Sequence, residues 1–154
     1  MIIKNYLNCT KEQIEKRQFN IFIGISLGNK YFSKENLKKY ILWALENTRE
    51  DVCVLIADKN HAINYEVLND YNKDRAENVA MRKGKEMKES IKKIVRGLPR
   101  EKHSLVKICR WEEARKSDYY KDKIKIFLEE FKTNKKFHDF IIKIVRQNLG
   151  KKAE

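Results

Sequence analysis

Two kinds of hydrophobic pattern follow one another along the chain, and together they predict an α/β fold. Short, mostly hydrophobic runs at residues 19–25, 52–57 and 105–109 are typical of strands buried in a parallel sheet. Between and after these runs, hydrophobic residues recur at the helical spacing i, i+3, i+4 and i+7. A strand, a helix and a second strand within about 40 residues form a right-handed βαβ unit. We therefore expect a three-layer, Rossmann-like α/β domain with a parallel sheet.

The remaining segments predict helices. Residues 10–13, Thr-Lys-Glu-Gln, have the form of a capping box and predict a short helix that ends before Gln18. Ser33 is placed to cap the next helix. A long helix is expected over residues 64–98, where a glycine and a proline end it. Further helices are expected at about 111–116, 119–132 and 135–148. No repeat or linker divides the chain, so a single domain over residues 1–154 is expected.

Composition narrows the class of protein. The chain has 154 residues, a formal net charge of +13 and 42% hydrophobic residues, which supply a core and exclude a disordered tail. One proline and five glycines are too few for the tight turns of an all-β sandwich. No apolar run approaches the roughly 18 residues of a membrane span, and residues 1–8 lack the hydrophobic region of a secretory signal. We expect a cytoplasmic protein without a membrane partner.

The cysteines do not indicate a disulfide framework or a metal site. Cys9, Cys53 and Cys109 are odd in number and far apart in the sequence. Cys53 and Cys109 fall in predicted strands, where we interpret them as buried small hydrophobic residues in preference to reactive thiols. No metal and no cofactor are expected.

Much of the positive charge falls in residues 82–107, inside and after the predicted long helix. Lys85, Lys88, Lys92 and Arg96 recur at i, i+3, i+7 and i+11, so they form a ridge roughly opposite the apolar face of that helix. Such a ridge can follow the phosphates of a nucleic acid, with an affinity that falls steeply as salt rises. A solvated surface helix is the alternative, and this pattern alone leaves both open.

Residues 24–28, Gly-Ile-Ser-Leu-Gly, match the G-x-S-x-G pattern of a nucleophile elbow. A serine at a sharp turn after a parallel strand is pushed out of the sheet, and nearby N–H groups can stabilise an oxyanion. Ser26 is therefore a candidate nucleophile. The alternative is a glycine-flanked turn in which the Ser26 hydroxyl only bonds the backbone.

An α/β-hydrolase is the enzyme class associated with this pattern, and it fits poorly. Its nucleophile follows several strands, whereas Ser26 follows the first predicted one. His61, in a loop after the second strand and beside Asp58, is the best candidate for a base. We expect His103 and His138 to be solvated.

The longer string at residues 23–33, Ile-Gly-Ile-Ser-Leu-Gly-Asn-Lys-Tyr-Phe-Ser, resembles the signature of the aminoacyl-tRNA-dependent cyclodipeptide synthases. This string is much more specific than G-x-S-x-G. The resemblance covers most of the chain and continues through the helix with Trp43, Ala57-Asp58, the basic helix, Arg110-Trp111 and the tyrosine near Asp118.

This resemblance implies a Rossmann-type domain similar to the catalytic domains of class I aminoacyl-tRNA synthetases, working without ATP or metal. The serine takes the aminoacyl group from one aminoacyl-tRNA, and a second aminoacyl-tRNA donates another to give a dipeptidyl-enzyme. The dipeptide then leaves as a diketopiperazine. An aminoacyl ester is already activated, and the chain contains no G-x-x-x-x-G-K-[ST] sequence for a nucleotide.

The resemblance also implies roles for individual residues. Ser26 is the nucleophile, and Gly24 leaves room for the substrate beside the first strand. Asn29 matches the asparagine that marks one of the two subfamilies. Leu55 falls where the family lines the first aminoacyl pocket, and Tyr120 matches the tyrosine that binds the aminoacyl amino group. The basic helix corresponds to the tRNA-binding helix through Lys85, Lys88, Lys92, Lys93 and Arg96.

One departure from the family is a Tyr-x-x-x-Glu motif that lies in a further C-terminal segment of its members. Tyr119 and Tyr120 do not match it, because Lys123 and Ile124 stand four residues later. We therefore expect a domain truncated at its C-terminal end. Two other functions remain as alternatives: a non-catalytic tRNA- or RNA-binding module of the same fold, and a G-x-S-x-G serine hydrolase.

Overall fold

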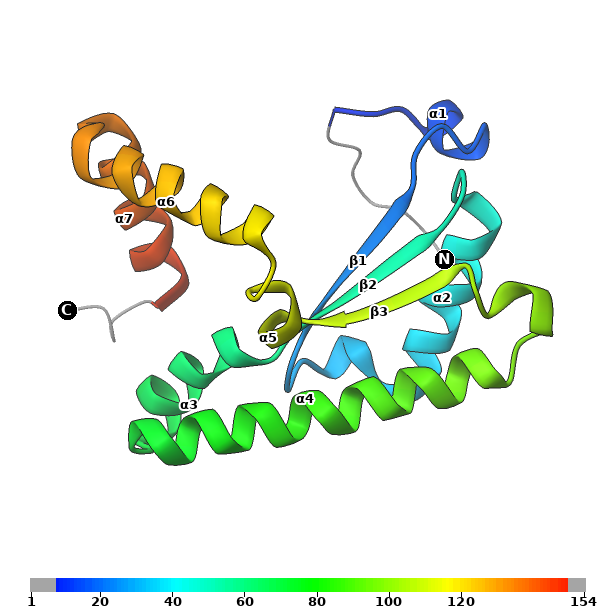
Figure 1. The fold of residues 1–154 in the computed structure, drawn as a ribbon, viewed down its shortest axis with the longest axis horizontal. Coiled ribbons are helices and arrows are strands. Elements are labelled where there is room, and N and C mark those ends of the chain that lie inside the picture. The colour runs from blue at the N-terminus through cyan, green and yellow to red at the C-terminus, as the bar shows by residue number, and fades with distance from the viewer. Residues whose placement is uncertain (1–7, 150–154) are drawn as a thin grey trace. The chain divides into compact units, whose positions relative to one another are not determined.

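Figure 1 shows the fold in a computed structural model, which describes residues 8–149 and the side chains of residues 8–147. The chain forms two compact units, Met1–Glu112 and Glu113–Glu154.

Within the described residues, the first unit is built on a parallel sheet of three strands in the order β1-β2-β3. The strands are β1 (Ile21–Ser26), β2 (Val52–Ala57) and β3 (Val106–Arg110). In their register, Ser26 lies opposite Ala57, and Ile56 lies opposite Arg110. The expected α/β class, with a parallel sheet and flanking helices, is confirmed.

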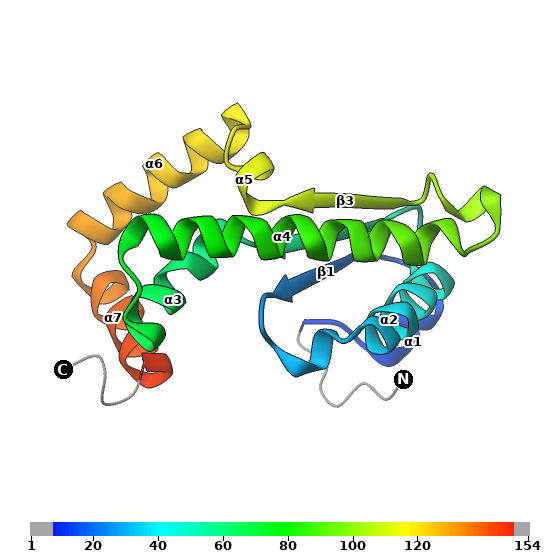
Figure 2. The ribbon, with the colours of Figure 1, turned by 90° about the horizontal axis from the view of Figure 1, so that it is seen from below.

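Two of the helices in the connections between the strands pack on one face of the sheet. They are α2 (Lys34–Asn47) and α4 (Lys73–Arg96) (Figures 1 and 2). Both fall on the same face because each right-handed connection adds its strand in the same direction across the sheet. Alternate residues of β2 point into this layer, and all of them are fully buried: Val52, Val54 and Ile56. Ile41 of α2 and Ile91 of α4 belong to the same core.

The prediction of one long helix over residues 64–98 is wrong. The structure has two helices, α3 (Ala62–Asn69) and α4, separated by a turn. Asp70 ends α3 with φ at 53°, in the left-handed region that a helix interior excludes. Asn72 begins α4, and its Oδ1 accepts a hydrogen bond from the Arg75 N–H at 2.9 Å.

The short elements follow their local sequence. The predicted capping box is present in α1 (Lys11–Glu15), where Thr10 Oγ1 accepts from the Gln13 N–H at 3.2 Å and Gln13 Oε1 accepts from the Thr10 N–H at 2.8 Å. Three 3₁₀ turns, η1 (Lys30–Phe32), η2 (Lys59–His61) and η3 (Arg100–Lys102), complete the connections. The short helix α5 (Trp111–Ala114) spans the boundary between the units.

The second unit is a helical hairpin of α6 (Asp118–Thr133) and α7 (Lys135–Leu149), close to the predicted bounds. Phe127 and Phe137 pack edge to face across it, with ring centroids 5.3 Å apart. None of the helices within residues 8–149 has both the length and the hydropathy needed to span a bilayer.

Candidate active site

Ser26 is the last residue of β1, and its side chain is exposed at the carboxyl end of the parallel sheet. The next residue, Leu27, is only 3% exposed, so it anchors the turn in the core. Gly28 then adopts φ at 75°, a left-handed conformation that favours glycine. The turn therefore presents the hydroxyl at the edge of an open α/β sheet where ligands usually bind.

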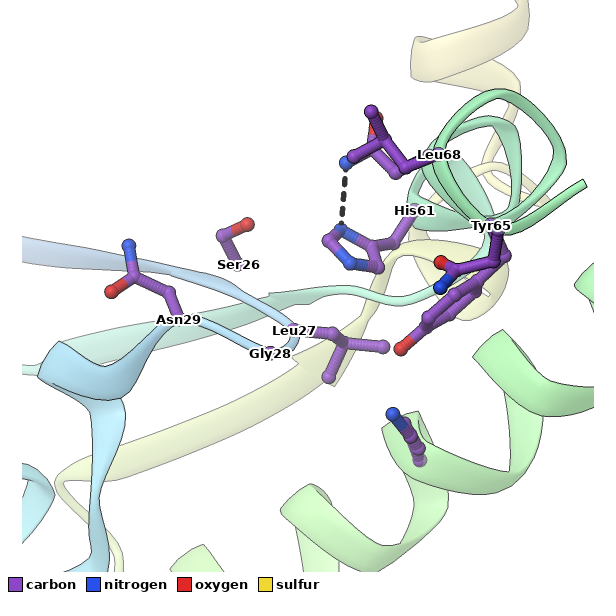
Figure 3. A pocket seen from close by; sticks show the side chains of 10 residues that line it. Ser26, Leu27, Gly28, Asn29, His61, Tyr65 and Leu68 are labelled. Atoms are coloured by element: carbon purple, nitrogen blue, oxygen red, sulfur yellow. Dashed lines mark hydrogen bonds between the residues drawn. The ribbon is translucent and has the colours of Figure 1, made fainter.

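Ser26 lines a cavity of about 360 Å³. The cavity lies between the turn after β1, helix α3 and helix α4. Figure 3 shows the ring of His61 between Ser26 and Tyr65. The residues that line the cavity are Ser26, Leu27, Gly28, Asn29, His61, Asn64, Tyr65, Leu68, Asn69 and Lys83. Most of their polar groups are uncharged hydrogen-bond donors and acceptors, and Lys83 adds one positive charge.

His61 is a hydrogen-bond donor toward the serine turn. Asn64 Nδ2 lies 3.1 Å from His61 Nδ1. An amide nitrogen only donates, so Nδ1 accepts and the proton of the neutral ring lies on Nε2. Nε2 is 3.8 Å from the position that a Cβ would take on Gly28. Burial, with a smaller contribution from the charge of Lys83, lowers the pKa of His61 from its ordinary value of 6.5 and favours this neutral form. In this tautomer His61 is not placed to act as a base toward Ser26.

Tyr65 contributes a hydroxyl that is free for a ligand. The residue is 9% exposed, and its hydroxyl oxygen is buried without a hydrogen-bond partner in the described part of the chain. The ring packs edge to face on His61 at 5.0 Å, and Lys83 Nζ lies 4.9 Å from the ring centroid. A buried hydroxyl usually has a partner, so this one points to a group that binds in the cavity.

Asn29 lines the same cavity, and its side chain also stabilises the chain that follows the serine turn. Its Oδ1 accepts a hydrogen bond from the Tyr31 N–H at 3.0 Å and caps the 3₁₀ turn η1. This cap holds the chain after the serine turn in place.

Gly24 and Leu55 lie opposite each other in the register of β1 and β2. Residues two apart on a strand point to the same face, so Gly24 and Ser26 share one face of the sheet, away from α2 and α4. A Cβ on Gly24 would meet the Phe22 ring at 3.5 Å, an ordinary contact. The structure thus brings Gly24, Ser26 and Leu55 together on one exposed or half-buried surface.

A buried ion pair, which sequence reasoning missed, supports the site. Arg110 Nε donates to Asp58 Oδ2 at 2.5 Å, and Asp58 is 0% exposed. Asp58 Oδ1 accepts from the N–H groups of Lys59 at 2.8 Å and Glu112 at 3.2 Å. The pair joins the ends of β2 and β3 at the start of the turn that carries His61.

Other predicted residues lie elsewhere. His103 is partly buried and its Nε2 lies 2.8 Å from the Leu98 carbonyl oxygen, which corrects the expectation that it is solvated. The side chain of His138 is 46% exposed, as expected for a solvated residue, and its ring lies 4.7 Å from that of Phe131. Cys53 and Cys109 lie in strands as predicted, but they are half-buried rather than buried. Burial, followed by the charge of Asp51, raises the pKa of the Cys53 thiol, which lowers its reactivity.

Tyr120 belongs to the second unit. It lies in the first turn of α6, is partly buried, and its N–H donates to Ser117 Oγ at 3.2 Å. Its neighbour Tyr119 is 74% exposed. The proposed contact of Tyr120 with an amino group stays a prediction.

The basic ridge of α4 does not open directly into the cavity. Lys83, which lines the cavity, and Lys85, where the ridge begins, are about 200° apart around the helix. The ridge therefore lies on the flank of α4 away from Lys83. Within the ridge, Lys92 pairs with Glu89 at 2.6 Å.

Comparisons with known proteins agree on one family. The family model described as cyclodipeptide synthase matches residues 7–154. A Mycobacterium tuberculosis protein, whose structure relates cyclodipeptide synthetases to type I tRNA synthetases, has a TM-score of 0.77 at 23% identity, over 92% of this chain and 60% of its own. A cyclodipeptide synthase of Fluoribacter dumoffii has a TM-score of 0.76 at 17% identity, over 96% of this chain and 64% of its own.

One from Staphylococcus haemolyticus has a TM-score of 0.71 at 23% identity, over 91% of this chain and 64% of its own. These structures establish the shared fold, and the chain spans less than two thirds of the length of each of the three. No curated protein matches the chain.

Proposed function

This chain belongs to the cyclodipeptide synthase family, and we propose that it forms a cyclic dipeptide from two aminoacyl-tRNAs through an aminoacyl group carried on Ser26. The observation that carries the proposal is the exposed hydroxyl of Ser26 at the end of β1, beside a polar cavity of about 360 Å³.

The reaction has three acyl transfers, and the two tRNA esters supply the free energy for the two peptide bonds that form. Ser26 Oγ attacks the ester carbonyl of one aminoacyl-tRNA, and the ribose oxygen leaves with a proton. The amino group of the aminoacyl-enzyme then attacks the ester of a second aminoacyl-tRNA, which forms a peptide bond and releases the second tRNA. Finally the free amine of the dipeptide attacks the Ser26 ester, the bond to Oγ breaks, and Oγ regains its proton. No external energy source enters any step.

The cavity supplies what these steps need from a protein. Each attack places negative charge on a carbonyl oxygen, and preorganised donors stabilise that charge. His61 Nε2–H and the Tyr65 hydroxyl are such donors in the cavity that Ser26 lines. A serine needs a base, and the amine of the substrate or the departing ribose oxygen serves here, since His61 is placed as a donor.

The side chain of the first amino acid is held, in this proposal, on the surface of Gly24 and Leu55, and Tyr120 binds its amino group. Lys85, Lys88, Lys92, Lys93 and Arg96 contact the tRNA. The mechanism uses no metal or cofactor. Because aminoacyl-tRNA is made in the cytoplasm, the enzyme acts there.

The experiment is covalent labelling. The purified chain is mixed with tRNA that carries a radiolabelled amino acid, and the protein is separated under denaturing conditions. We expect a labelled band that disappears in Ser26→Ala and persists in Ser104→Ala, an exposed serine in the same unit. Salt-sensitive tRNA binding without any label would contradict the enzyme and support the non-catalytic module. Label from a simple ester substrate without tRNA would support a serine hydrolase.

A further inference from the structure

A groove runs between α2 and α4 on the flank of α4 opposite the ridge. It consists of two hollows, of about 320 Å³ and about 390 Å³. The first is lined by Leu27, Gly28, Phe32, Lys34, Leu37, Lys83, Glu86, Met87 and Ser90. The second is lined by Lys34, Glu35, Lys38, Lys93, Ile94 and Gly97. We call these two hollows the α2–α4 groove.

The groove adjoins the cavity that Ser26 lines. The cavity and the first hollow share Leu27, Gly28 and Lys83. The first and second hollows share Lys34. From Lys83 to Lys93 the path follows α4 for ten residues, about 15 Å. A flexible chain that lies in the groove would pass around the turn at Gly28 to reach the Ser26 side chain, which points to the other face of the sheet.

The walls of the groove carry positive charge that is not neutralised by ion pairs. Within the described residues, Lys34, Lys38 and Lys93 have no carboxylate partner, whereas Lys92 on the ridge is paired with Glu89. The walls contain two carboxylates. Of these, Glu86 is engaged by Arg82 at 2.7 Å, and Glu35 lies in the first turn of α2. The groove therefore has an excess of unpaired ammonium groups.

The floor of the groove is apolar, and it includes one aromatic ring. Phe32 is half-buried in the first hollow, where its ring packs edge to face on Tyr40 at 6.3 Å. Lysines above an aromatic and aliphatic floor suit a single nucleic acid strand, because phosphates meet the ammonium groups while bases stack on the floor. The amino-terminal end of α2, with Ser33 as its cap, adds the positive end of a helix dipole.

We propose that the α2–α4 groove binds the unpaired 3′ end of an aminoacyl-tRNA and leads its ester to Ser26. The proposal rests on the proposed function, which supplies aminoacyl-tRNA as the substrate. The groove and the ridge then contact different parts of the RNA: the groove contacts the single strand, and the ridge contacts the phosphates of the paired stem.

The test compares two tRNAs and two triple variants of the full chain. One tRNA is intact, and the other lacks its unpaired 3′ nucleotides. The groove variant is Lys34→Ala/Lys38→Ala/Lys93→Ala, which spares Lys83 because that residue also lines the cavity. The control removes three charges from the opposite flank, Lys85→Ala/Lys92→Ala/Arg96→Ala. Thermal unfolding checks that both variants fold.

We expect the groove variant to bind intact tRNA more than about tenfold more weakly at about 100 mM salt, and to flatten the slope of log K against log salt by about 2. Its affinity for the trimmed tRNA should change little, because the strand that fills the groove is missing. The control should weaken both tRNAs alike. The groove assignment is overturned if its variant weakens both tRNAs equally, or neither.

Labelling of Ser26 separates the two proposals. If the groove variant loses the preference for the intact 3′ end while wild-type Ser26 takes no label, the groove stands and the proposed reaction fails. If Ser26 is labelled at the wild-type rate in the groove variant, at tRNA concentrations below saturation, the reaction stands and the groove assignment fails.

Discussion

His61 shows how the environment of one residue determines its chemistry. Its Nδ1 accepts a hydrogen bond from Asn64 Nδ2, and this hydrogen bond exists only when Nδ1 carries no proton. A proton on Nδ1 would face the amide N–H instead. Burial and the nearby Lys83 charge also disfavour the protonated ring, so the pKa of His61 is lowered in the folded protein.

The lowered pKa predicts a pH dependence of stability. As the pH falls below the ordinary value of 6.5, the unfolded chain takes up a proton at this position before the folded chain does. The stabilisation that His61 contributes is therefore present above that pH and is lost as the pH falls through the lower folded pKa. In urea unfolding between about pH 8 and pH 5.5, wild type should lose more stability than His61→Gln. Parallel curves for the two proteins would show that the pKa of His61 is the same in both states.

At the scale of elements, helix α4 approaches the end of β2 through a glycine. Gly84 is buried, and a Cβ added there would lie 2.4 Å from the Cβ of Asp58. Two carbon atoms that are not bonded to each other cannot approach so closely, so the backbone of α4 or of the turn at Asp58 would have to shift. Asp58 is held in turn by Arg110, so the helix, both strands and the turn to His61 meet at one point.

Replacing Gly84 with alanine is expected to destabilise the protein. Alanine favours a helix by about 1 kcal/mol over glycine, but the clash with Asp58 costs more. We expect Gly84→Ala to lower the free energy of unfolding by about 1–3 kcal/mol in urea denaturation. Gly97→Ala is the matched control, since its Cβ would lie 3.4 Å from the Ile94 carbonyl oxygen and its φ is −82°. Equal stability of Gly84→Ala and wild type would mean that α4 moves freely against β2.

The elements that depend on local sequence were predictable, and those that depend on distant partners were not. Hydrophobic runs give the three strands, and the glycine-flanked pattern places Ser26 at the end of β1. The break at Asp70 was missed because hydrophobic residues at helical spacing occur on both sides of it, and the turn between the two helices is only three residues long, residues 70–72. Asp58 and Arg110 are 52 residues apart, and predicting their ion pair requires the register of β2 and β3. Hydrophobic patterns along the sequence do not determine that register.

The candidate site divides in the same way. The serine turn is one continuous segment, so its sequence identifies it. The Tyr65 hydroxyl and Lys83 of the cavity lie on α3 and α4, and only the packing of those helices brings them to Ser26. The α2–α4 groove was missed because the helical spacing that defines the ridge ignores α2, which contributes half of the lysines in the groove.

For the molecule as a whole, the positive net charge opposes self-association, and exposed apolar surface favours it. The chain carries a formal net charge of +13. At the same time β1 has only one neighbouring strand among the described residues, and Phe22 on it is 61% exposed. An unpaired strand edge invites pairing with another chain, and net charge of one sign opposes that contact.

Self-association should therefore increase when salt screens the charge. Raising the ionic strength from about 50 mM to about 500 mM shortens the screening length to a few ångströms and removes most of the repulsion between copies. Light scattering of the RNA-free protein should rise over this range. Phe22→Lys should suppress the rise more than Tyr31→Lys, which adds the same charge at an aromatic residue of equal exposure, 62%, outside the strands. Equal suppression by the two variants would mean that net charge alone governs association, and that the edge of β1 has no part in it.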